Sequence, residues 1–258
     1  MHIVARAFLG VALGVAVGGA SQAAPTTAPV EVKVGAPLAR FDKIRPGVHR
    51  YLRYKQTGET FTPADIWTRE IRFESRDGQP RLHIVQHWDS SATPAAKTMD
   101  SWFEVGTFAP ITHVRRSIKD GQTKVEGYAF TADRVVGLAD LPDNAAKTYD
   151  VAAPVRTFNF ETDMELLQAL PLKDGFEASI NFLHPGGGAP APYLFKVTGS
   201  EVLTTPAGGK IDCWVMTTDY NRPDFPATRF WLAKESQVMV KVISPLPDGS
   251  AVVKVLMY

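Results

Sequence analysis

The chain has 258 residues, with 28 Lys and Arg against 27 Asp and Glu, so its formal net charge is only +1. This balance gives no electrostatic case for nucleic acid as a partner. Cys213 is the one cysteine, which excludes an intramolecular disulfide and leaves stability to packing.

The first 23 residues have the features of a secretory signal peptide. Arg6 precedes an apolar run over 7–20, and small residues occupy the positions that a signal peptidase inspects before a cut after Ala23. This run is too short for a membrane-spanning helix, and no later segment approaches the roughly 20 apolar residues that a span needs. We therefore expect residues 1–23 to be removed and the protein to be periplasmic or secreted.

The rest of the chain is expected to be one folded unit behind a short tail. Residues 24–36 begin with a stretch rich in Pro, Thr and Ala and are expected to be a flexible lead-in. Residues 37–258 show no internal repeat and no change of composition, so we expect a single β-rich domain. Within it, segment 40–55 is basic and contains aromatic residues, which suits either an anionic head group or a solvated strand face.

Alternating apolar and polar runs, joined by Asp-Gly pairs, predict β-hairpins. Three Asp-Gly pairs join such runs: 77–78 joins 66–75 to 81–88, 120–121 joins 112–119 to 122–130, and 248–249 joins 237–243 to 250–257. Further strands are expected at 47–54, 176–183, 193–199, 210–220 and 227–234. Consecutive hairpins build an antiparallel meander, and so many strands with one apolar face must curve to protect their edges.

One short helix is expected among the strands. Thr162 and Glu165 have the spacing of a capping box, apolar residues follow at helical spacing, and Pro171 ends the run. The predicted fold is therefore mainly β. It is a curved antiparallel meander that forms a half-barrel, with one short helix over its open side.

The sequence lacks the motifs of the common enzyme classes. There is no Gly-x-Ser-x-Gly elbow, no phosphate-binding loop and no dinucleotide fingerprint. His83 and His87 have a metal-like spacing, but four residues along a strand span about 13 Å, too far for two rings to share an ion. Cys213 lies within a predicted strand, which is typical of a small buried hydrophobe. We expect no catalytic residue, no metal and no cofactor.

Aromatic side chains are the candidates for a ligand-binding surface. The five tryptophans lie in or beside predicted strands, where they either fill a core or line a cavity in a curved sheet. We expect ligand contacts on the concave face from Trp102, Phe103, Trp214, Phe230 and Trp231.

Several segments resemble a known group of proteins. They are GTFAP at 106–110, KIDCWV at 210–215, RFWLAK at 229–234, VMVKV at 238–242 and the last Asp-Gly hairpin. Together they resemble uncharacterised exported bacterial β-rich domains of unknown function, whose fold is similar to that of periplasmic lipoprotein carriers and outer-membrane lipoprotein-sorting proteins. The resemblance implies a half-barrel and a hydrophobic ligand, and it transfers no catalytic residue.

Three functional hypotheses follow. The leading one is an exported, non-enzymatic protein that binds an apolar or amphiphilic, lipid-like molecule on the concave face of its sheet. The second is a secreted hydrolase whose unrecognised site combines His113 or His184 with a carboxylate. The third is an envelope scaffold that binds another envelope protein and no small ligand. None of the three involves nucleic acid or a membrane span.

Overall fold

The computed structural model describes residues 28–90, 96–205 and 207–257. The expected signal peptide, 1–23, lies outside the described residues. The helical elements are the α-helix α1 (Asp163–Gln168) and two 3-10 turns, η1 (Phe41–Lys43) and η2 (Phe160–Thr162). The strands are β1 (Val30–Val32), β2 (Gly47–Thr57), β3 (Thr60–Arg76), β4 (Gln79–Ser90), β5 (Ala96–Glu104), β6 (Pro110–Lys119), β7 (Gln122–Phe130), β8 (Arg134–Gly137), β9 (Asp150–Ala152), β10 (Phe158–Asn159), β11 (Glu177–Leu183), β12 (Ala191–Thr204), β13 (Lys210–Thr218), β14 (Thr228–Ala233), β15 (Met239–Pro245) and β16 (Ala251–Met257).

The three predicted Asp-Gly hairpins are confirmed. In the β3–β4 turn, Asp77 and Gly78 both have positive φ angles, 53° and 72°. In the β6–β7 turn, Asp120 and Gly121 repeat this geometry, with φ angles of 52° and 73°. Positive φ at both central residues suits the right-handed twist of the flanking strands, and Asp-Gly adopts it at little cost. The third pair joins β15 to β16.

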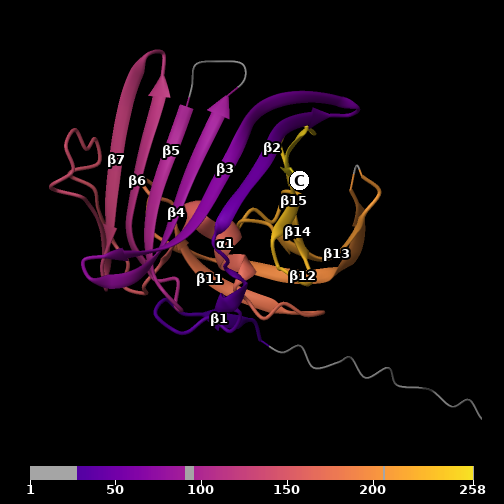
Figure 1. The fold of residues 1–258 in the computed structure, drawn as a ribbon, viewed down its shortest axis with the longest axis horizontal. Helices are drawn as coiled ribbons and strands as arrows, with labels where there is room; N and C mark the ends of the chain where they lie inside the picture. The colour runs from indigo at the N-terminus through magenta and orange to yellow at the C-terminus, as the bar shows by residue number, and fades with distance from the viewer. Residues whose placement is uncertain (1–27, 91–95, 206, 258) are drawn as a thin grey trace, which may run out of the picture.

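The sixteen strands of the described residues form one sheet, in the order β1-β11-β12-β13-β14-β15-β16-β2-β3-β4-β5-β6-β7-β8-β9, with β10 beside β11. The last strand, β16, pairs with β2, so strands from both ends of the chain meet in the middle of the sheet. The sheet curves strongly but stays open, which confirms the predicted mainly β, half-barrel architecture (Figure 1).

Two strand pairs differ from the predicted antiparallel pattern. Both β1 and β10 run parallel to β11. Because parallel neighbours are joined by long connections, no local turn signal marks them in the sequence. Strand β1 also falls within the expected lead-in, 24–36, of which residues 24–27 lie outside the described residues. The lead-in is therefore structured at Val30–Val32.

Helix α1 lies inside the curve of the sheet, between the long strands β3–β5 and strands β11 and β12 (Figure 1). All six of its residues are buried, and Leu166 and Leu167 pack in one core with Ile84 of β4 and Phe182 of β11. The helix thus fills this part of the concave side.

The predicted capping box at the start of α1 is wrong. Thr162 makes no cap with its side chain, and its hydroxyl donates instead to the carbonyl of Asn159. Glu165, the other expected partner, turns toward the sheet and pairs with Arg69. The helix is therefore positioned by tertiary contacts that helical spacing alone does not reveal.

Candidate functional site

The concave face divides into an apolar part and a polar part. Alternation along each strand sends every second residue inward. Near α1 the inward residues are apolar, such as Leu82 and Ile84 of β4 and Phe103 of β5. Further along the same strands the inward residues are polar or aromatic, such as Gln86 and Trp88 on β4 and Lys97 on β5. The polar part is therefore where a ligand could meet the concave face.

A buried network of charges joins the helix to the polar part of the sheet. The Arg69 guanidinium donates to Glu165 of α1, with Nε 2.6 Å from Oε1, and to the side-chain oxygen of Gln86 at 3.0 Å. Trp67 donates to the same oxygen at 3.0 Å, and Gln86 in turn donates to the carbonyl of Glu161 at 2.7 Å. Because Arg69 and Glu165 are both almost fully buried, water does not stabilise either charge. Each charge is stabilised by the other and by the hydrogen bonds of the network.

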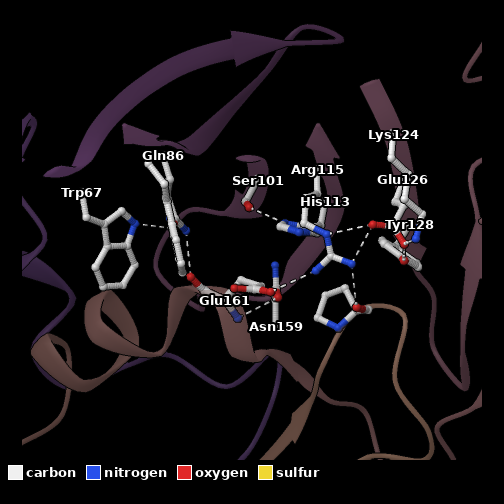
Figure 2. A network of polar contacts seen from close by, with 12 residues as sticks. Trp67, Gln86, Ser101, His113, Arg115, Lys124, Glu126, Tyr128, Asn159 and Glu161 are labelled. Atoms are coloured by element: carbon white, nitrogen blue, oxygen red, sulfur yellow. Dashed lines mark hydrogen bonds and ion pairs between the residues drawn. The ribbon is translucent and has the colours of Figure 1, made fainter. Parts of the chain in front are cut away.

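Arg115 of β6 forms the second centre of the network (Figure 2). It donates to Glu126 of β7 at 3.0 Å and to the carboxylate of Glu161 at 3.2 Å. Lys124 adds a second cation beside Glu126, at 2.9 Å. The network therefore runs without a break from η2 to β7, where it holds the end of the sheet against the chain that leads into α1.

Two polar atoms beside this network have no hydrogen-bond partner among the described residues, His113 Nε2 and Asn159 Nδ2. The other ring nitrogen of His113 lies 2.8 Å from the Ser101 hydroxyl. Burial lowers the pKa of His113 to about 4, so the ring is neutral at physiological pH. Because His113 and Ser101 are both fully buried, this pair does not face a substrate from solvent.

The polar part of the concave face carries cations stacked on two tryptophans. The rings of Trp67 and Trp88 meet edge to face, with centroids 5.0 Å apart. Arg53 and Lys97 lie 4.3 and 4.5 Å from the centre of the Trp88 ring. A hollow of about 450 Å³ opens beside Trp88 and is lined also by Arg53, Lys97 and Asp65. We call it the concave hollow.

The opposite face of the sheet holds an apolar groove of about 710 Å³, which we call the outer groove. The β12–β13 hairpin forms one side of it, and β15, β16 and β2 form the other. Its apolar lining includes Leu52, Leu203, Ile211, Val240, Val255 and Met257. A second hollow of about 720 Å³ shares Ile211, Val240 and Met257 with the outer groove and adds Lys210 and Lys234 at its rim.

A small second core supports the outer groove. Cys213, Val215, Trp231 and Val240 are buried together on this side of the sheet, and Ile211 packs against them. Burial raises the pKa of Cys213 to about 11, so the thiol stays protonated and unreactive. This setting matches the expectation that Cys213 is a buried hydrophobe.

The structure does not bring the five predicted ligand residues together. Phe103 and Phe230 face inward and are buried in the main core, while Trp231 is buried in the second core on the other side. Trp102 stacks on His83, outside the main core, and Trp214 lies at the edge of that core beneath Lys234. Neighbours along a strand point to opposite faces, so the pairs 102–103 and 230–231 are necessarily split. Ligand contact by these residues stays a prediction.

Two of the histidines singled out by the sequence, His83 and His184, are engaged in contacts with other side chains. His83 stacks on Trp102, and its two ring nitrogens lie 2.9 Å from Glu74 and 2.9 Å from Asp100. His184 packs on Phe160 with ring centroids 3.8 Å apart. Within the described ranges, no group of three His, Cys, Asp or Glu side chains is placed to bind a metal ion.

The sequence points to only part of these surfaces. Arg53 belongs to the basic segment 40–55, and Trp88 is one of the five tryptophans, but the sequence analysis does not predict that either lies near Lys97. The three meet because β2, β3, β4 and β5 are adjacent and in register. Trp88 and Lys97 are cross-strand partners, but Lys97 lies on β5, a strand that is not among those predicted from the sequence.

Two solved structures that are similar to this chain contain domains of unknown function. One is a β-barrel-like protein of the DUF1849 domain from Brucella abortus, 11% identical, with a TM-score of 0.49, covering 81% of this chain and 96% of that one. Another is a DUF1329 family protein from Desulfovibrio piger, 9% identical, with a TM-score of 0.32, covering 84% of this chain and 87% of that one. No curated protein matches the sequence.

In the described part of the chain, no helix is both long and apolar enough to cross a membrane. The expected resemblance to an uncharacterised β-rich family is confirmed, while its extension to lipoprotein carriers stays a prediction. The family model that describes proteins of unknown function, DUF3108, matches residues 51–256, from β2 to β16. The chain therefore belongs to the DUF3108 family.

Proposed function

We propose that this chain is an exported, non-enzymatic binding protein for an apolar or amphiphilic, lipid-like molecule, and that this molecule binds in the outer groove. The observation that carries the proposal is the groove itself: about 710 Å³ of mostly apolar lining on a protein surface. Small-molecule sites are usually hollows of roughly 300–1,000 Å³ with apolar walls and a few polar groups. Because burying apolar surface away from water is favourable, an open apolar hollow of this size favours an apolar ligand.

The rim of the groove suits a ligand with an anionic end. Lys241 lines the groove, and Lys210 and Lys234 line the adjoining hollow. Lys234 is paired with Asp212 at 2.9 Å, whereas neither Lys210 nor Lys241 has an ion pair among the described residues. An acyl chain along the apolar wall would place its carboxylate or phosphate within reach of these ammonium groups.

The outer groove replaces the concave face as the favoured place for the apolar part of the ligand. On the concave side, Leu166 and Leu167 of α1 fill the space beside Phe103 and Phe230. Side chains that are close-packed in a native core leave no room for an acyl chain between them. Trp231 is part of the second core beneath the outer groove. This one of the five predicted residues would therefore support the wall of the groove.

Displacement of a fluorescent fatty acid tests the groove. Met257, 48% exposed, lines it, and Leu194, 45% exposed, lies on β12 away from it. We expect Met257→Asp to weaken binding about tenfold or more, because the acyl chain would lie against an unpaired carboxylate. Leu194→Asp should bind as the parent does. Equal binding by both variants, or no binding by the parent, would contradict the proposal.

Export is tested separately by sequencing the N-terminus of protein recovered from the envelope. A signal peptide cut after Ala23 gives a chain that begins at Ala24. We expect this mature form in the periplasm or the medium. An intact chain that begins at Met1 and remains in the cytoplasm would contradict export without bearing on the outer groove.

A further inference from the structure

The concave hollow lies beside an unusual concentration of cations. Arg53 and Lys97 stack on Trp88, while Arg69 and Lys254 stack on Trp67, each 4.4 Å from the ring centre. Since the two tryptophan rings are in contact, four cationic side chains share one aromatic pair. The face of an aromatic ring attracts cations but does not neutralise their charge.

Carboxylates offset only half of these charges. Arg53 is paired with Asp65, and Arg69 with Glu165. Lys97 and Lys254 have no carboxylate within ion-pair distance in the described part of the chain. Lys254 is also the direct cross-strand partner of Arg53, and like charges opposite each other on one face repel.

The surroundings of the two lysines disfavour their charged forms. Burial lowers the pKa of Lys97, and the nearby guanidinium groups of Arg115 and Arg53 lower it further, while Glu161 and Glu126 act against them. For Lys254, burial lowers the pKa to about 8, although Asp163 favours the charged form. Both ammonium groups are therefore short of negative charge.

We propose that the concave hollow binds a small oxyanion, a phosphate or carboxylate group, held by Lys97 and Arg53 beside the ring of Trp88. The hydroxyl-bearing Ser117 lines the same hollow and is the cross-strand partner of Lys97, so it can donate a hydrogen bond to the anion. Asp65 also lines the hollow, but Arg53 holds both of its oxygens. Lys254, beside Arg53, adds positive charge to the site.

This inference is independent of the outer groove, because the two surfaces lie on opposite sides of β2. Inward Arg53 belongs to the concave hollow, while its neighbours Leu52 and Tyr54 line the outer groove. The oxyanion is either a free ion or the head group of an amphiphile. The two sources share the same recognition chemistry, and two titrants separate them.

Calorimetric titration with inorganic phosphate at pH 7 and low ionic strength tests the site. We expect the parent to bind, and Lys97→Gln to bind about tenfold more weakly or worse, since a charge-assisted contact is lost. Lys97→Arg, which keeps the charge, should bind within about threefold of the parent. Lys147→Gln, at an exposed lysine outside the hollow, is the matched control and should leave the affinity unchanged.

A second titration uses dodecyl phosphate and the Met257→Asp variant, in which binding in the outer groove is weakened. A head-group site is indicated if Met257→Asp binds dodecyl phosphate much more tightly than inorganic phosphate and the double variant Met257→Asp, Lys97→Gln loses this binding. A free-ion site is indicated if Met257→Asp binds the two compounds with equal affinity. The proposal is overturned if the parent binds neither compound at millimolar concentration, or if Lys97→Gln binds both as the parent does. Thermal unfolding of each variant confirms that it is folded.

Discussion

Neighbouring residues on β16 and β2 present opposite chemistry to the two sides of the sheet. Lys254 and Arg53 form a cross-strand pair that faces inward, toward the tryptophans and the buried charges. Val255 and Leu52, the next pair along, face outward and line the apolar groove. In most curved sheets the apolar side chains face the concave core and the charges face water.

The reversal follows from what covers each side. Helix α1 has only six residues and fills one part of the concave side, so the inward residues beyond it need not be apolar. On the outer side, the β12–β13 hairpin lines an apolar groove together with β15, β16 and β2, so outward residues there gain from being apolar. Charge therefore gathers on the inner side of β16 and β2, and apolar surface on their outer side.

The largest expected effect comes from breaking the charge balance on the concave side. Glu165→Ala leaves the fully buried Arg69 without its carboxylate, and we expect the free energy of unfolding to fall by about 3–5 kcal/mol. Chemical denaturation measures this loss. The double variant Arg69→Met, Glu165→Leu removes both charges and should recover most of it. A single variant as stable as the parent would mean that Arg69 reaches water.

The packing of α1 is tested next. Leu167→Ala removes a fully buried side chain from the helix, and we expect a loss of about 2–5 kcal/mol in the free energy of unfolding. Val155→Ala, at a side chain that is 60% exposed, is the control and should change stability by less than about 0.5 kcal/mol. Similar small losses in both variants would show a loosely filled concave side.

The smallest expected effect concerns the outer face of β4, which is polar where that of β16 is apolar. Burial alone would lower the pKa of His83, but Asp100 and Glu74 outweigh it and raise this pKa above 6.5. The pKa of Asp100 is lowered, because its contacts with His83 and Trp102 outweigh its own burial. Protonated His83 therefore stabilises the fold below about pH 6.5, and this contribution is lost as the pH rises through its folded pKa.

Ionised Asp100 makes the complementary contribution, which is present above pH 3.8 and lost as the pH falls through its lowered pKa. The difference in stability between the parent and His83→Gln should thus be largest between about pH 4 and pH 6.5. We expect it to stay below about 1 kcal/mol, because Asp100 and Glu74 are both partly exposed. Denaturation curves across this range measure it, and a difference that grows above pH 7 would contradict the assignment.

The sequence was most informative where structure is local. Asp-Gly pairs and alternation predicted the hairpins β3–β4, β6–β7 and β15–β16, because both signals act within a few residues. It could not predict that β16 pairs with β2, or that β1 and β10 run parallel to β11, since long-range pairing leaves no short motif. The candidate sites depend on this pairing, so their residues could be listed as tryptophans or basic residues but not grouped.

Photolabelling tests most directly whether the lipid-like ligand binds in the outer groove. A fatty acid with a diazirine on its acyl chain is bound, irradiated, and its sites of attachment are mapped by mass spectrometry of peptides. We predict label on β13, β15 and β16, at peptides that contain Ile211, Val240 and Val255, with competition by unlabelled fatty acid. Label confined to α1 and the inward residues of β4 would place the ligand on the concave side and contradict binding in the outer groove.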